Sequence, residues 1–268
     1  MPRIIPCCLA LALIAACGGG GGGSSQTPTT PSPIPSVDTC NSLGGTGSTP
    51  GTGILNGSTC SPERSSVVLV NLRDANNQPT GACSGTVIAP RAVLTAAHCL
   101  DEETRIARIW VGVGAEVVAD SFAFYPNYRF NTPGTFDVGV ILMAQDLPRS
   151  PVPILTSRDA RAGETAIIAG WGRDQSNVPA TLRAGSTTLS AVNGSLLETL
   201  YAPPSSSVCS GDSGGPILLS EGGTWSVGGI TSATSDNVCN TGTNFYQAIR
   251  PPSVRDFVLQ HVPNAIQR

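Results

Sequence analysis

The chain has 268 residues with 31 Gly, 22 Pro and only 12% charged side chains, so it is neither a coiled coil nor a charge-rich disordered tail. All 15 cationic side chains are arginines, and the lack of lysine excludes Schiff-base catalysis, a phosphate-loop lysine and serine–lysine dyads. The net charge is −3 without a basic stripe, so we expect no nucleic-acid partner. Any histidine base or ligand must be His98 or His261.

Residues 1–16 are predicted to be an export signal. Arg3 precedes an apolar run that is too short to span a bilayer. The tetrapeptide Ile-Ala-Ala-Cys that ends at Cys17 resembles a bacterial lipobox, in which cleavage leaves an acylated cysteine as the first residue. Gly18 is the kind of following residue that such lipoproteins have in the outer membrane. We expect a lipid anchor on Cys17 in the outer membrane or cell envelope, or alternatively a secreted protein.

Residues 17–53 form the predicted tether and possible propeptide. They begin with an unbroken glycine run over 18–23 and continue in Ser, Thr, Pro and Gly. Such a segment has too little apolar surface to offset its ordering entropy. We expect a spacer here and a folded domain over 54–268.

Nine cysteines occur, of which Cys7 and Cys8 lie in the predicted signal and Cys17 is the lipid site. Six remain, and in an exported chain they predict three disulfides, for which number alone allows 15 connectivities. No C-x-x-C spacing occurs among them, which argues against structural zinc. The six are Cys40, Cys60, Cys83, Cys99, Cys209 and Cys239.

The predicted elements of the domain are short, β-branched strands broken by Gly, Pro, Asn or Asp, typical of an all-β barrel or sandwich. The last segment differs, because Ser253 is a candidate helix cap followed by apolar residues at helical spacing over 254–262. The predicted strands are 66–71, 85–88, 92–95, 106–111, 116–119, 138–143, 165–169, 186–192, 216–219, 224–231 and 244–249.

Three segments carry residues suited to catalysis. Residues 209–216 (Cys-Ser-Gly-Asp-Ser-Gly-Gly-Pro) place a serine between glycines, where the backbone can turn two N–H groups toward one point. Residues 94–99 (Leu-Thr-Ala-Ala-His-Cys) place a histidine at the end of an apolar run, and residues 136–142 place an aspartate before one. Taken singly, these are also compatible with an ordinary turn, a core histidine and a cap residue.

Together with Gly-Trp-Gly at 170–172, these segments are similar in their motifs, order and spacing to those of the chymotrypsin/trypsin family of serine peptidases. The resemblance covers 54–268. It implies an all-β fold of two six-stranded antiparallel β-barrels with a C-terminal helix, and an active site between the barrels.

The resemblance also implies the role of each site residue. Ser213 would be the nucleophile, His98 the general base and Asp137 the carboxylate that orients it. The backbone N–H groups of Gly211 and Ser213 would form the oxyanion hole. Ser232 matches the serine of the family that hydrogen-bonds the catalytic aspartate.

Two disulfides are implied by the same resemblance, and the two cysteines left over are assigned to each other. The pair nearest the histidine closes a loop of about 16 residues, worth roughly 3 kcal/mol in a chain-entropy model. The second pair would brace the substrate pocket. The three pairs are Cys83–Cys99, Cys209–Cys239 and, by remainder, Cys40–Cys60.

The predicted specificity pocket is uncharged. In this family the residue six before the nucleophile lies on the pocket floor, and here it is Ser207. An unpaired substrate cation would be costly to bury there, which disfavours cleavage after Arg or Lys. Thr234 and Asn244 align with the pocket walls and indicate a shallow pocket. We predict cleavage after small or medium uncharged residues.

Ile54 begins a segment that resembles the mature N-terminus of the family. There the freed amine pairs with the aspartate before the nucleophile, here Asp212. Cleavage after Gly53 would then activate the enzyme, although no trypsin-like protease would cut at glycine. In the alternative interpretation, Ile54 is the start of the first strand of an uncut chain.

The sequence therefore predicts a serine endopeptidase with protein or peptide substrates, a membrane contact through the lipid on Cys17, and a monomeric state. The alternatives are a catalytically silent binding module or a structural surface protein on the same fold. We predict no cofactor. No calcium loop is recognisable over 100–119, which neither requires nor excludes a metal.

Overall fold

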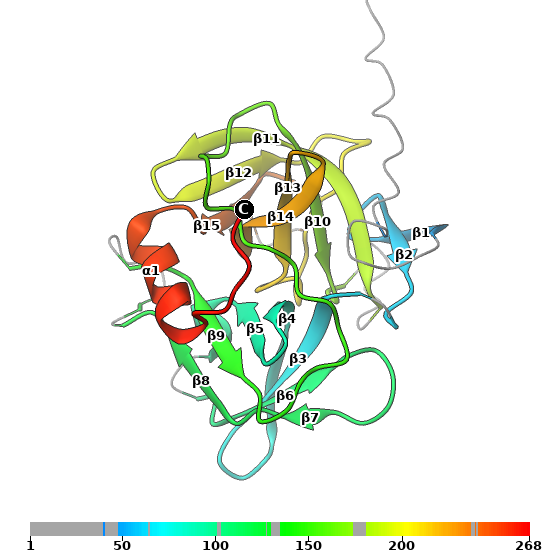
Figure 1. The fold of residues 1–268 in the computed structure, drawn as a ribbon. Coiled ribbons are helices and arrows are strands. Elements are labelled where there is room, and N and C mark those ends of the chain that lie inside the picture. Colours follow the sequence, from blue (N-terminus) through cyan, green and yellow to red (C-terminus); the bar gives the residue numbers. More distant parts are fainter. Residues whose placement is uncertain are drawn as a thin grey trace, which may run out of the picture. The chain divides into compact units, whose positions relative to one another are not determined.

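The computed structural model describes residues 40, 48–63, 65–100, 103–126, 128–129, 135–173, 181–236, 239 and 241–268. Residues 37–268 form one compact unit of two antiparallel sheets and one C-terminal helix (Figure 1). This arrangement confirms the predicted all-β, trypsin-like fold. No helix in the described ranges is long and apolar enough to cross a membrane.

The first sheet contains seven strands in the order β7-β6-β3-β4-β5-β9-β8. Its strands alternate between buried and partly exposed positions where one face is open to solvent, as in Ile-Ala-Arg-Ile-Trp of β6. The central strands have longer buried stretches, because the first four residues of β3 and all four residues of β5 are buried. The strands are β3 (Val67–Arg73), β4 (Pro79–Ala89), β5 (Ala92–Thr95), β6 (Ile106–Trp110), β7 (Val117–Val118), β8 (Ser121–Phe124) and β9 (Gly139–Leu142).

The second sheet closes into a barrel of six strands, because β12 pairs with both β15 and β11 at the ends of the order β11-β10-β13-β14-β15-β12. The predicted six strands are therefore found in this barrel, whereas the first sheet has seven. The barrel strands are β10 (Thr165–Gly170), β11 (Arg183–Asn193), β12 (Leu196–Leu200), β13 (Pro216–Glu221), β14 (Thr224–Thr234) and β15 (Thr243–Ala248).

A short hairpin of β1 (Ser48–Gly53) and β2 (Gly57–Cys60) extends the second sheet, since β2 pairs with the first residues of β11. Its sequence has no β-branched run, and the Cys40–Cys60 disulfide fixes its end. Residues assigned to the tether thus contribute a strand. The predicted tether before Ser48, apart from Cys40, lies outside the described residues.

The C-terminal helix α1 (Pro252–His261) follows β15 of the second sheet and contacts β9 of the first sheet, beside which it lies in Figure 1. The Phe257 ring packs 5.8 Å from the ring of Tyr125, which follows β8. The predicted cap at Ser253 is wrong. The N-cap is Pro251, without a side-chain cap hydrogen bond, because proline suits the first helical turn and starts the helix earlier.

Candidate active site

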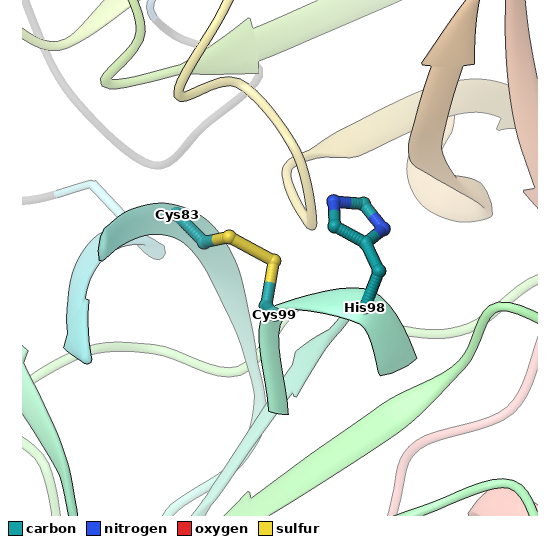
Figure 2. Close-up of side chains that lie close together, drawn as sticks. All are labelled: Cys83, His98 and Cys99. Carbon is teal, nitrogen blue, oxygen red and sulfur yellow. A yellow bond between two sulfur atoms is a disulfide. The ribbon is translucent and has the colours of Figure 1, made fainter. Parts of the chain in front are cut away.

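His98 lies in a short 3₁₀ helix (Ala97–Leu100) directly after β5. Its neighbour Cys99 is bonded to Cys83 of β4, which ties this turn to the adjacent strand. Figure 2 shows the imidazole beside that disulfide and pointing away from the helix. The His98 side chain is 24% exposed, so the ring is accessible while its backbone is anchored.

Asp137 lies two residues before β9 and is almost fully buried. Its Oδ2 accepts a hydrogen bond from His98 Nδ1 at 2.8 Å, and its Oδ1 accepts the His98 backbone N–H at 3.0 Å. Ser232 Oγ donates to Oδ2 at 2.5 Å. The structure thus brings together three of the predicted site residues, His98, Asp137 and Ser232.

The pKa of Asp137 reflects two opposing effects. Burial raises it, but the hydrogen bonds and charge of His98, together with the Ser232 hydrogen bond, lower it by more. The resulting pKa is below the ordinary value of 3.8. The aspartate is therefore ionised near neutral pH and holds the proton of His98 on Nδ1.

Ser213 lies in the turn that leads into β13. The backbone N–H of Ser84 in β4 donates to its carbonyl oxygen at 2.8 Å. Gly214 follows with φ of +81°, and a Cβ there would lie 2.1 Å from Thr95 Oγ1 and 3.1 Å from the backbone nitrogen of Ala96. Only glycine permits this approach. The serine turn therefore packs against the chain that leads into His98.

The same turn is linked to Asp137 through β14. The N–H of Gly214 donates to the carbonyl oxygen of Thr231 at 2.9 Å, and the next residue is Ser232. Gly211, the other predicted oxyanion residue, has φ of +94°, and its carbonyl oxygen accepts a hydrogen bond from Ser84 Oγ at 2.9 Å. The turn is thus held by β4 on one side and β14 on the other.

Asp212 is 1% exposed and accepts two backbone hydrogen bonds, from Gly172 N–H on Oδ1 and from Cys209 N–H on Oδ2, each at 2.8 Å. Burial raises its pKa to about 7, although these N–H groups and the charge of Arg183 act in the opposite direction. The carboxylate fastens the serine turn to the segment after β10. Arg183 was not predicted as a site residue.

Ile54, the predicted activation residue, is 1% exposed and lies in the turn between β1 and β2 with φ of +32°. The next residue, Leu55, accepts a hydrogen bond from the N–H of Ser207 at 3.2 Å. Ile54 is therefore a core residue that lies at a turn and not within a strand. Whether cleavage before it occurs stays a prediction.

The predicted pocket residues form a buried hydrogen-bond network. Asn244 Nδ2 donates to Ser207 Oγ at 3.0 Å and to Thr199 Oγ1 at 3.1 Å, and Thr199 lies 3.1 Å from the Tyr246 hydroxyl. All four side chains are buried and uncharged. Thr234, the other predicted wall residue, is partly exposed and donates from Oγ1 to the Asp236 carbonyl oxygen at 2.5 Å. The sequence analysis did not predict Thr199 or Tyr246 as site residues.

The three disulfides of the structure are Cys40–Cys60, Cys83–Cys99 and Cys209–Cys239, the same pairs that the sequence analysis assigned. Cys83, His98 and Cys99 also place their ligand-type atoms within 4.8 Å of one another. The two sulfurs are bonded to each other, however, and only a thiolate ligates a metal well. This cluster is therefore not a metal site in the oxidised protein.

His261, the second histidine, lies in the last turn of α1, where its ring packs 4.6 Å from that of Phe257 and Nδ1 is 3.0 Å from the Phe257 carbonyl oxygen. It is thus a helix residue remote from His98 in the sequence and in its contacts. Cys7, Cys8, Cys17 and the whole predicted signal lie outside the described residues.

Comparison with known proteins agrees with this geometry. The family model Trypsin matches residues 54–258. Chymotrypsin-2 of Vespa crabro is 28% identical over 162 residues, which cover 52% of this chain and 73% of that protein. Kallikrein-11 of Homo sapiens is 30% identical over 170 residues, 52% of this chain and 58% of that protein. Chymotrypsin-like elastase family member 1 of Macaca fascicularis is 27% identical over 187 residues, 59% of this chain and 70% of that protein.

The matched family model spans most of the chain and includes all three segments described above. The alignments with individual relatives cover between half and three-quarters of those proteins. The fold, the disulfides and the family match agree with one another. The chain therefore belongs to the trypsin family of serine peptidases.

Proposed function

We propose that the protein is an active serine endopeptidase whose catalytic triad is Ser213, His98 and Asp137. The observation that carries the proposal is the pair of hydrogen bonds from His98 to the buried Asp137 carboxylate, at 2.8 and 3.0 Å, with Ser232 as a third donor. This arrangement fixes the imidazole in the tautomer whose Nδ1 carries the proton, so that its unprotonated Nε2 can accept one. A catalytically silent module has no need of such a tautomer.

In the proposed mechanism, Ser213 Oγ attacks the peptide carbonyl carbon while His98 Nε2 accepts its proton. The imidazolium then forms beside the ionised Asp137, which stabilises it. The N–H groups of Gly211 and Ser213 donate to the oxyanion, and His98 returns the proton to the leaving amine. Water then hydrolyses the acyl-enzyme with His98 as base again.

Covalent labelling tests this function. A fluorescent peptide diphenyl phosphonate with valine next to phosphorus is expected to label the protein once, on Ser213, because only an activated serine attacks it. Ser213→Ala should abolish the label, and the exposed Ser220 changed to Ala should leave it intact. Absence of label on folded wild-type protein would contradict an active peptidase and favour a silent binding module or a surface protein.

We further propose that the enzyme cleaves after small or medium uncharged residues. The amide nitrogen of Asn244 donates to Ser207 and to Thr199, so the polar groups of the predicted pocket already have partners. None of these side chains offers a carboxylate to a substrate guanidinium. The pocket therefore suits side chains such as Ala, Val or Thr.

Matched peptide amides that differ only in the residue before the scissile bond measure this specificity. We expect kcat/KM to be at least about 100-fold higher for Ala or Val than for Arg, because the Arg cation would be buried without a partner. Ser207→Asp should raise the Arg rate relative to the Ala rate. Faster hydrolysis of the Arg substrate by the wild-type protein would contradict the assignment.

We also propose that Cys17 carries a lipid anchor, which rests on the Ile-Ala-Ala-Cys tetrapeptide and the apolar run before it. Two or more acyl chains would hold the protein stably on a membrane, at about 0.8 kcal/mol per buried methylene. Cells grown with labelled palmitate should incorporate it into the wild-type protein and not into Cys17→Ala. Equal incorporation into both proteins would contradict the anchor.

A further inference from the structure

Arg183 is a buried cation close to the catalytic turn. It is the first residue of β11, where it pairs with Gly170 of β10 on one side and Thr59 of β2 on the other. The residue is only 4% exposed. Arginine is almost never buried so deeply unless opposite charge or hydrogen bonds compensate for its lost hydration.

Gly172 connects this arginine to Asp212. Arg183 Nη1 donates to the Gly172 carbonyl oxygen at 3.1 Å, and the Gly172 N–H donates to Asp212 Oδ1 at 2.8 Å. A Cβ on Gly172 would lie 2.6 Å from Oδ1, so no side chain fits between the backbone here and the carboxyl group. Arg183, Gly172 and Asp212 are thus linked by a chain of two buried hydrogen bonds.

The electrostatics of Asp212 show why the arginine matters. The ionisable groups that act on it are Arg183, whose charge favours the carboxylate, and Tyr246, whose own burial raises its pKa and keeps it neutral at pH 7. With the arginine present, the carboxyl pKa is about 7. Without it, the carboxyl would bind a proton more readily.

Protonation would disturb the turn directly. Both carboxylate oxygens of Asp212 accept a backbone N–H, from Gly172 and Cys209. A protonated carboxyl has a hydroxyl that is a poorer acceptor, so one of these bonds would weaken. Gly211 lies between Cys209 and Asp212, and Asp212 directly precedes Ser213, so a weakened hydrogen bond here would disturb the predicted oxyanion hole.

We propose that Arg183 is a positioning residue that supplies the positive charge opposite Asp212 in the uncut chain, so that the Ser213 turn is formed without cleavage before Ile54. Ile54 lies buried in the turn between β1 and β2, and in an uncut chain it has no free amine to offer Asp212. The arginine takes the part that the resemblance assigns to a freed N-terminus. The proposal rests on the proposed function, since its readout is the reactivity of Ser213.

The test compares Arg183→Met, Arg183→Lys and the control Arg158→Met, each confirmed as uncut by intact mass after reduction. Arg158 is a partly buried arginine that forms a salt bridge with Glu164 at 2.8 Å and lies before β10. We expect Arg183→Met to lower kcat at least about 30-fold with KM changed less than about threefold, and Arg183→Lys to recover most of the loss. Arg158→Met should react like the wild type.

Two results would overturn the proposal: an Arg183→Met chain with wild-type kcat, or an Arg183→Lys chain as slow as Arg183→Met. If Arg183→Met does not fold, phosphonate labelling of the wild type decides the matter. After reduction, the labelled chain should still contain residues before Ile54. Label confined to chains that begin at Ile54 overturns the role of Arg183, whereas no label on either form overturns the proposed function itself.

Discussion

Replacing Ser213 by Ala is expected to lower kcat by about 10⁴- to 10⁶-fold. The variant lacks the Oγ atom that becomes acylated, and with it the proton that His98 accepts. KM should change little, since the Oγ atom contributes little to ground-state binding. The measurement is steady-state hydrolysis of a peptide amide with Ala or Val before the scissile bond.

The triad assignment also predicts strong non-additivity. His98→Ala should cost about as much as Ser213→Ala, and the double variant should lose little more than either, because the two residues act as a unit. Ser220→Ala, an exposed serine on β13, is the matched control and should retain activity. A loss below about tenfold in Ser213→Ala would contradict the assignment.

The second large effect is expected for Asp137→Asn, which should lower kcat by about 10⁴-fold near neutral pH. Asparagine is nearly isosteric, but its amide can donate a hydrogen to His98 Nδ1 and stabilise the wrong tautomer. Ser232→Ala removes one hydrogen bond to the carboxylate and keeps its charge, so it should cost less than about 20-fold. Equal losses in the two variants would show that charge and tautomer are not what Asp137 provides.

Asp137 also predicts a pH dependence of stability. Its pKa in the folded protein is below 3.8, so the unfolded chain binds more protons when the pH falls through this range. The free energy of unfolding should therefore decrease as the pH falls below 3.8, and this group should contribute its full stabilisation above that value. Urea unfolding at several acidic pH values should show a shallower decrease for Asp137→Asn. Identical slopes would contradict the depressed pKa.

Most barrel strands were predictable because local pattern and tertiary context agree. The eleven predicted strands each overlap an observed one, and the buried strands β3 and β5 read as apolar runs. The strand β12 was missed, although Asn193-Gly194 before it is the strongest short hairpin signal and Gly194 has φ of +60°. The short strand β8 was missed as well.

The strand β2 could not be predicted from its own residues. Gly-Ser-Thr-Cys has no apolar alternation, and it becomes a strand because β11 supplies backbone partners and Cys40 fixes its end. Its existence is a tertiary effect. The same holds for β1, which among the described strands pairs with β2 alone.

The candidate site likewise contains residues that local motifs identify and residues that only tertiary structure places. The sequence motifs identified His98, Asp137 and Ser232, and the structure shows hydrogen bonds from His98 and Ser232 to Asp137. Arg183 carries no local signal, since it is one of 15 arginines and its burial depends on three strands coming together. Thr199 also went unrecognised, because its role depends on the register of β12 against β15.

The Cys40–Cys60 disulfide would have a mechanical consequence under the proposed lipid anchor on Cys17. Tension on the chain before Cys40 passes through the sulfur–sulfur bond to Cys60 and from there into β3. The intervening loop, which contains the turn at Ile54, lies off this path and carries no load. Pulling on the predicted tether before Cys40, by flow or by a bound substrate, would therefore leave that turn unstretched while the disulfide is intact.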